Sequence, residues 1–453
     1  MIGKRRRRLF FLAAAAAAGA AVFAFVGHRA SGAPSPRTTY YQDVKPILDG
    51  RCVSCHRIGG IGTFALTTYR EAYRHRRLIT GAVTSRQMPP WHAERGVRRY
   101  LYDPSLTIAQ IRTIRSWVAA GAPRGNPAAP APSLPPVAPQ LSRVDLRLPM
   151  PQAYTPRHRQ GHDDYRCFVL DWKPGETTYI RGVSVTPGQA AEVHHILLFL
   201  AEPRSAATVE TWDAADAAPG YSCYGGPSAT GASLEAWQFV AGWVPGSSGS
   251  DLPAGTGVKV APGSRLILQV HYNLDHARPR PDRSTVELSL APSVERRGAF
   301  IPHVNPVWVL NPRTFAIPAG RKTVVHTYDA DPRPVAKFLV PDLDLSHGFT
   351  IYTTLLHMHR LGVSGRVTLE RPGGSREVLL SIRRWDFHWQ REYHLADPVV
   401  FEPGDSLSIT CRHDNSRANQ LLVRGRRAEP RLVTWGENTS DEMCIAFLYV
   451  TER

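Results

Sequence analysis

The hydrophobic and polar positions follow different patterns on the two sides of residue 140. Between residues 38 and 121, apolar residues recur at helical spacing, as in "YYQDVKPILDGRC" and "TIAQIRTIRSWVAAGAP". From about Leu141, short alternating runs such as "RLILQVHYNL" and "STVELSLAP" are separated by Pro-Gly and Gly-Asp turns. The pattern predicts a small all-α domain over 38–121, followed by a mainly β region of antiparallel β-sandwich long enough for two domains.

Between these patterns lies a segment rich in proline and alanine, "APRGNPAAPAPSLPPVAPQ", residues 122–140. This composition favours an extended, semi-rigid spacer. We therefore expect the helical domain to be joined by this linker to two sandwich domains, at 141–305 and 306–453.

The chain begins with a basic cluster, an apolar stretch of 18 residues from Leu9 to Val26, and small residues around Ala33. This order predicts that residues 1–33 are a signal peptide or a membrane anchor. The sequence leaves open whether the segment is cleaved. In either case we expect a periplasmic or otherwise extracytoplasmic protein, which contacts a membrane only through residues 9–26 if they are retained.

The net charge of +17 has the sign that a nucleic-acid-binding protein would need. Lysine is scarce, however, and arginine is spread along the chain without a basic helix or an aromatic-basic stripe. We therefore interpret the excess as an arginine bias plus the N-terminal "KRRRR", and expect no nucleic-acid partner.

Two of the six cysteines lie in "CVSCH", which contains Cys52, Cys55 and His56. C-x-x-C-H is the attachment signature of c-type haem, although a thiol–disulfide or zinc site could use the same cysteines. The flanking helical segments and "SRQMPPW" resemble class I cytochromes c, which favours haem. The resemblance makes His56 the proximal ligand and Met88 the sixth ligand, with His92 as the alternative.

The other four cysteines are an even number in a chain expected to be exported, which predicts two disulfides. Three pairings are possible. Two bonds, Cys167–Cys223 and Cys411–Cys444, would each stay within one expected domain.

Histidines occur in pairs within the predicted strands. In "TTLLHMHRLG", His357 and His359 are two residues apart, so in a strand both imidazoles would share a face and could bind one ion. A strand whose polar face carries two histidines is the alternative. The adjacent His194 and His195 could reach one metal only at a strand end, a bulge or a strongly twisted segment.

From about Leu141 onward the chain resembles the copper type II, ascorbate-dependent monooxygenases, a family that includes peptidylglycine α-hydroxylating and dopamine β-monooxygenases. The resemblance is carried by "YRCFVL", "VHHILLF", "YSCYG", "AWQFVAGWVPG", "LPAGTGVKV", "LQVHYN", "LLHMHRLG", "FEPGDSLSITC" and "GENTSDEMC", in the same order. It implies two jelly-roll-like β-sandwich domains that each bind one copper ion.

The resemblance also implies the ligands. The first copper, for electron transfer, would be bound by His194, His195 and His271. The second, which meets O₂, would be bound by His357, His359 and Met443, whose soft thioether favours Cu(I). With the haem, we expect two copper ions and one covalently bound haem c.

The implied reaction is hydroxylation of a C–H bond of a small organic substrate by O₂, with electrons from an ascorbate-like donor or a redox protein. The fused haem suggests the hypothesis that it relays these electrons. A non-catalytic copper and haem protein, for electron transfer or copper handling, is the alternative. Two unlike, complete ligand sets favour the enzyme.

In the peptide-amidating branch, an arginine before the His-x-His pair and an asparagine and a tyrosine after the methionine bind the substrate. This chain has Leu355, Ile445 and Phe447 there. We therefore expect an apolar or aromatic substrate rather than a glycine-extended peptide. "RWDFHWQREY", residues 384–393, is expected to be an aromatic strand near the substrate. Five other histidines are expected to be structural or surface residues: His162, His303, His347, His388 and His413.

Overall fold

The structure is a computed structural model. It describes residues 37–58, 60–134, 140–157, 163–230, 237–244, 247, 249–274, 278–423 and 426–453. The expected signal segment 1–33, its apolar stretch 9–26 and His162 lie outside the described residues. Within the described ranges, no helix combines the length and the apolar character needed to cross a bilayer.

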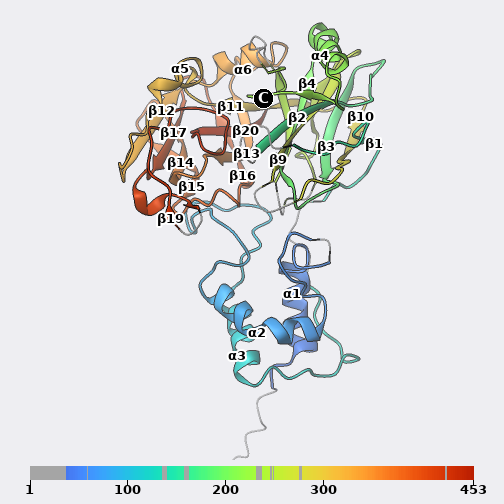
Figure 1. The fold of residues 1–453 in the computed structure, drawn as a ribbon, viewed down its shortest axis with the longest axis vertical. Coiled ribbons are helices and arrows are strands. Elements are labelled where there is room, and N and C mark those ends of the chain that lie inside the picture. Colours follow the sequence, from blue (N-terminus) through green and yellow to red (C-terminus); the bar gives the residue numbers. More distant parts are fainter. Residues whose placement is uncertain are drawn as a thin grey trace, which may run out of the picture. The chain divides into compact units, whose positions relative to one another are not determined.

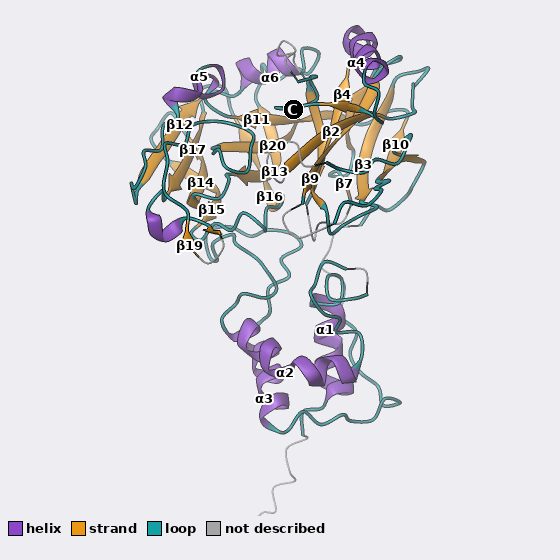
Figure 2. Cartoon of the chain, viewed as in Figure 1, coloured by secondary structure: helices purple, strands orange, loops and turns teal. Residues whose placement is uncertain are grey.

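Helices are the regular elements in the described part of the chain before residue 120 (Figure 2). They are a π-helical turn and three α-helices: Tyr40–Val44, α1 Lys45–Arg51, α2 Tyr69–Thr84 and α3 Ile108–Ala119. Capping boxes at Thr68 and Thr107 satisfy main-chain donors at the start of α2 and α3. These helices enclose their own core, which includes Leu48, Ile114 and Trp117.

The rest of the chain is mainly β with largely antiparallel sheets, as predicted (Figure 1). In its first half, one sheet has the order β5-β2-β9-β4-β6 and the facing one β1-β10-β3-β8, with β7 paired to β3. Their core contains Phe168, Ile196 and Val270. The elements are β1 Leu146–Pro149, β2 Asp163–Val169, β3 Thr178–Thr186, β4 Val193–Ala201, α4 Pro203–Ala215, β5 Tyr221–Ser222, β6 Gln238–Trp243, β7 Ser250–Asp251, β8 Thr256–Val260, β9 Arg265–Asn273 and β10 Thr285–Ala291.

The second half also has two layers, β11-β20-β13-β16 and β12-β17-β14-β15, around a core that includes Ile351, Leu380 and Ile409. The parallel pairing of β8 with β11 joins the first layer to the sheet of the preceding half. The elements are β11 Arg296–His303, α5 Pro306–Leu310, β12 Val324–Ala330, α6 Arg333–Leu339, β13 Phe349–His357, β14 Gly362–Glu370, β15 Arg376–Ile382, β16 Tyr393–Phe401, β17 Ser406–His413, β18 Leu422–Val423, β19 Arg426–Arg427 and β20 Ile445–Thr451.

Two disulfides are present, and their pairing is the one that keeps each bond within one half. Cys167 in β2 is bonded to Cys223, one residue after β5. Cys411 in β17 is bonded to Cys444, one residue before β20. The second bond therefore ties the layer that contains β17 to the start of β20.

A buried guanidinium holds the connection between α4 and β5. Arg166, fully buried in β2, donates to the carboxylate of Asp216 at 2.8 Å. It also donates to the carbonyls of Ala218, Pro219 and Gly220 at 2.7–2.9 Å. The hydrogen bond from Arg166 lowers the pKa of Asp216 to about 2.

We expect Arg166→Met to lower the free energy of unfolding by about 3 kcal/mol, because Asp216 and the carbonyls lose their charged donor. Part of this difference should disappear as the pH falls from about 4 toward the lowered pKa, since the carboxyl is then protonated. Urea denaturation at several pH values would measure both effects. Arg204→Ala, which removes an exposed ion pair with Glu202, is the control and should change stability by less than about 1 kcal/mol. An equal loss in the two variants would contradict the role of Arg166.

Candidate metal centres

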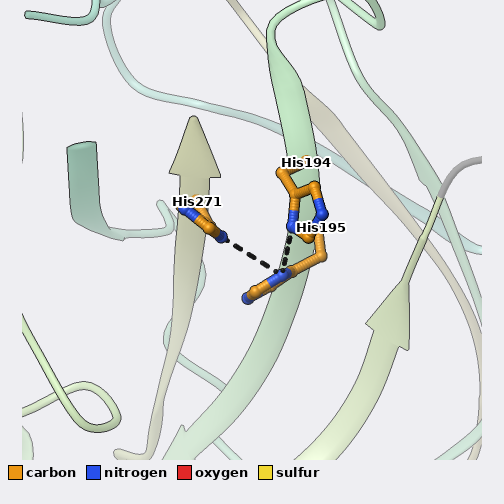
Figure 3. A group of neighbouring side chains, drawn as sticks. All are labelled: His194, His195 and His271. Carbon is orange, nitrogen blue, oxygen red and sulfur yellow. Dashed lines mark hydrogen bonds between the residues drawn. The ribbon is translucent and has the colours of Figure 1, made fainter. Parts of the chain in front are cut away.

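The first centre lies on two neighbouring strands, β4 and β9. The register of this pair shifts between Val193 and His195, which is the irregularity that two adjacent histidines need to reach one ion. His271 in β9 is the register partner of His195. The Nδ1 atom of His195 lies 3.2 Å from that of His194 and 3.4 Å from that of His271 (Figure 3).

This arrangement fits a metal ion. The candidate ligand atoms of His194, His195 and His271 all lie within 4.8 Å of one another. Burial lowers the pKa of His194 and His195 well below the usual value, and the neighbouring His271 lowers it further. Ring nitrogens 3.2–3.4 Å apart span an edge of a tetrahedron with metal–nitrogen bonds of about 2.0–2.1 Å. Neutral imidazoles suit copper among other metals.

An acidic residue orients His271. Its Nε2 donates to Asp163 at 3.0 Å, which leaves Nδ1 for a metal, and Asn273 donates to the same oxygen at 2.9 Å. Burial alone would raise the pKa of Asp163, but the hydrogen bond and charge of His271 outweigh it, and the pKa is about 2. Tyr165 stacks on the His271 ring at 4.1 Å between centroids.

The second centre lies where β13 ends. His357 is the last residue of β13, so His359 follows the strand, and the prediction that both lie within one strand is wrong. Their rings are nevertheless only 5.0 Å apart between centroids. β13 pairs with β20, and His357 is the partner of Ile445. Met443 comes two residues before Ile445, and it lines the same cavity as His357 and His359.

The hydrogen bonds of the second centre leave one nitrogen of each imidazole for a metal. The Nδ1 of His357 donates to the Gln390 side chain, and the Nδ1 of His359 donates to the carbonyl of Asp441 at 3.1 Å. Burial lowers the pKa of His357 to about 3 and also lowers that of His359. With the thioether of Met443, the set has two nitrogens and one sulfur, a combination that suits copper in its reduced state.

A buried carboxylate that the sequence analysis missed holds this centre together. Glu442 is fully buried and accepts from the main-chain N–H groups of His359 at 2.9 Å, Met443 at 3.3 Å, and Leu361. His413, also fully buried, lies 3.4 Å from the same carboxylate. Burial raises the pKa of Glu442, but the hydrogen bond and charge of His413 outweigh it and the pKa is lowered. The signal in the sequence was an acid directly before the candidate ligand methionine.

Both centres line one cavity of about 1000 Å³. Phe387 lies between them, since its ring stacks on His194 at 4.9 Å and meets His359 edge-on at 6.0 Å. The prediction that 384–393 form an aromatic strand is wrong, because 383–392 are the loop between β15 and β16. Phe387 and Trp389 of this loop nevertheless line the cavity.

The candidate haem residues line the same cavity: Cys52, Cys55, His56 and Met88. Cys52 and Cys55 carry free thiols, and burial raises the pKa of Cys52 to about 12. The Nδ1 of His56 donates to the carbonyl of Phe64 at 3.0 Å, which leaves Nε2 for an iron ion. Two thiols and an oriented imidazole fit covalent haem attachment.

Comparison with known proteins adds an independent observation. Residues 339–452, which include His357, His359 and Met443, match the family model described as copper type II ascorbate-dependent monooxygenase, C-terminal domain. The chain is 23% identical over 267 residues to MOXD1 homolog 1 of Drosophila melanogaster, covering 56% of this chain and 35% of that protein. It is 24% identical over 310 residues to dopamine beta-hydroxylase of Rattus norvegicus, covering 65% and 45%.

The dopamine beta-hydroxylase of Equus caballus is also 24% identical, over 357 residues, covering 77% of this chain and 53% of that protein. The chain thus spans between 35% and 53% of the length of these relatives. Among solved structures, the major capsid protein P2 of bacteriophage PM2 matches with a TM-score of only 0.24 at 8% identity, covering 68% of this chain and 98% of that one.

The sequence comparisons and the donor sets agree. Residues 339–452, which match the C-terminal domain of the copper type II ascorbate-dependent monooxygenases, contain the donor set of two imidazoles and a thioether.

Proposed function

We propose that this protein is an exported copper-dependent monooxygenase that hydroxylates a C–H bond of a small organic substrate with O₂. The observation that carries the proposal is that two unlike donor sets, one of three imidazoles and one containing a thioether, line a single cavity. We assign the jelly-roll-like copper domains of the family to residues 141–305 and 306–453.

The two centres have different roles in this proposal. His194, His195 and His271 would bind the electron-transfer copper, and His357, His359 and Met443 would bind the copper that meets O₂. Bound copper would supply one-electron transfer and activation of O₂. The protein's own contribution is positional: Asp163, Gln390 and the Asp441 carbonyl each fix one imidazole, so that a chosen ring nitrogen faces the cavity.

The substrate is expected to be apolar or aromatic. The three positions that carry polar anchors in the amidating branch, Leu355, Ile445 and Phe447, line the cavity, and so do Phe239 and Phe300. Apolar walls beside the second centre would bind a hydrocarbon or aryl group by excluding water.

Residues 38–121 would bind one haem c through Cys52, Cys55 and His56, with Met88 or His92 as the sixth ligand. A haem there would supply one-electron transfer, and the outside donor would be ascorbate-like or a redox protein. The two disulfides support an oxidising, extracytoplasmic location such as the periplasm.

The first test is metal content together with Met443→Ile. We expect two copper ions and one c-type haem per chain. We expect the variant to keep the three-histidine copper but to lose substrate-dependent O₂ uptake by about 100-fold or more, because second-centre ligation changes. Met150→Ile, in the buried core of the other half, is the control.

Binding of a single copper ion, or unchanged turnover in Met443→Ile, would contradict the proposal. Two copper ions without substrate-dependent O₂ uptake would favour the alternative, a non-catalytic copper and haem protein.

The proposed haem relay is tested by rapid mixing. Protein with reduced haem and oxidised copper should show haem oxidation and loss of the cupric signal with the same time course. A Cys52→Ser/Cys55→Ser variant, reduced by ascorbate, separates loss of the relay from loss of the copper centres. The relay fails if the haem stays reduced while copper is reduced by other routes.

The substrate assignment is tested by comparing aryl-alkyl compounds with a peptide that ends in glycine. Apolar contacts at Leu355, Ile445 and Phe447 should give product only with the aryl-alkyl series, as measured by O₂ uptake and mass spectrometry. Amidation of the peptide at a comparable rate would contradict the assignment, because it would show that the polar anchors of the amidating branch are not needed.

A further inference from the structure

We propose that residues 91–101, here called the strap, are a structural part of the second metal centre. The strap lies in the chain between helices α2 and α3, far in sequence from that centre. It holds loop 383–392, which orients His357 through Gln390. The proposal concerns the chain's own contacts; only its copper-affinity arm rests on the proposed function.

The loop forms two hydrogen bonds with the second centre. The Nε2 of Gln390 donates to the carbonyl of Phe387 at 3.0 Å, so its Oε1 faces the His357 imidazole and accepts from Nδ1. The indole N–H of Trp385 donates to the carbonyl of His359 at 3.0 Å. A displacement of the loop would therefore change the orientation of both candidate ligands.

The strap is hydrogen-bonded to the end of β15, directly before the loop. Ala93 forms a β-bridge with Ile382, and the main-chain N–H of Glu94 donates to the carbonyl of Ser381 at 2.7 Å. The Ser381 hydroxyl donates to the Glu94 carboxylate at 2.8 Å, and Arg383 pairs with the same carboxylate.

The strap is also hydrogen-bonded to the start of β16, directly after the loop. Tyr100 forms a β-bridge with Leu395, and the N–H of Leu101 donates to the carbonyl of His394 at 2.8 Å. The ring of Trp91 packs edge-on against Tyr393, which is 1% exposed, with 5.0 Å between centroids. Both ends of the loop are therefore fixed by the same short segment.

A third contact reaches the middle of the loop. The His92 imidazole lies close to the main chain of Trp389, the residue directly before Gln390. The guanidinium of Arg391 lies 5.3 Å from the centre of the Trp91 ring. Because a loop held at both ends and in its middle has few alternative conformations, the strap should keep Gln390 in place before any metal binds.

The test compares strap variants in the full chain. Trp91→Ala should raise amide hydrogen exchange in residues 385–391 of the copper-free protein about tenfold, because the aromatic contact with Tyr393 is lost. It should also weaken Cu(I) binding at the second centre about tenfold and leave the three-histidine centre unchanged. Trp91→Phe, which keeps a ring, should largely restore both values.

Two further variants make the result specific. Tyr100→Phe removes only the hydroxyl that donates to the carbonyl of Leu379 at 2.9 Å. It should show the same changes at smaller size, and it replaces Trp91→Ala in the test if that variant does not fold. Arg99→Ala removes an ion pair whose partners are 79% and 70% exposed, and should change neither measurement.

Unchanged exchange in the loop in both Trp91→Ala and Tyr100→Phe would overturn the proposal, and so would equal changes in Arg99→Ala. If the wild-type chain binds no copper at the second centre, the proposed function fails. The exchange measurement on copper-free protein would still decide whether the strap holds the loop.

Discussion

Antiparallel register between neighbouring strands is the constraint on which both candidate metal centres depend. The pairing of β4 with β9 places His195 opposite His271, and the pairing of β13 with β20 places His357 opposite Ile445, two residues after Met443. His359 and Met443 are 84 positions apart in the chain. A shift of one residue in either pairing would turn the ligands to opposite faces, so the hydrophobic cores that fix the register also fix the chemistry.

Two buried acids then help to hold the candidate ligands in place. Asp163 fixes the His271 ring directly, whereas Glu442 acts on the main chain on both sides of the second centre. The Cys411–Cys444 disulfide restrains the main chain next to Met443, since Cys444 follows Met443 in the chain and is bonded to β17. Ligands held in this way lose little conformational freedom when a metal binds.

Patterns among neighbouring residues were enough to predict the features that depend on neighbouring residues. Alternating runs predicted the strands, composition predicted the disulfides, and the two metal-ligand sets came from family motifs. The prediction of a strand at 384–393 was wrong because aromatic residues usually favour strands. Here they line the cavity and contact the strap instead. Glu442, Gln390 and the strap were missed because their roles arise from contacts across as many as about 300 positions, which leave no periodicity in the sequence.

The common cavity is the reason why we propose an enzyme rather than a storage protein. A carrier gains nothing from a large cavity lined by aromatic side chains. The proposed reaction of O₂ with an apolar substrate, in contrast, would need room for the substrate beside one metal and a second metal nearby. Phe387 contacts a histidine of each centre and belongs to the loop that the strap holds. The segment that starts three residues after Met88 thus reaches the wall shared by both centres, so the helical part of the chain contributes to their geometry as well as being linked to them.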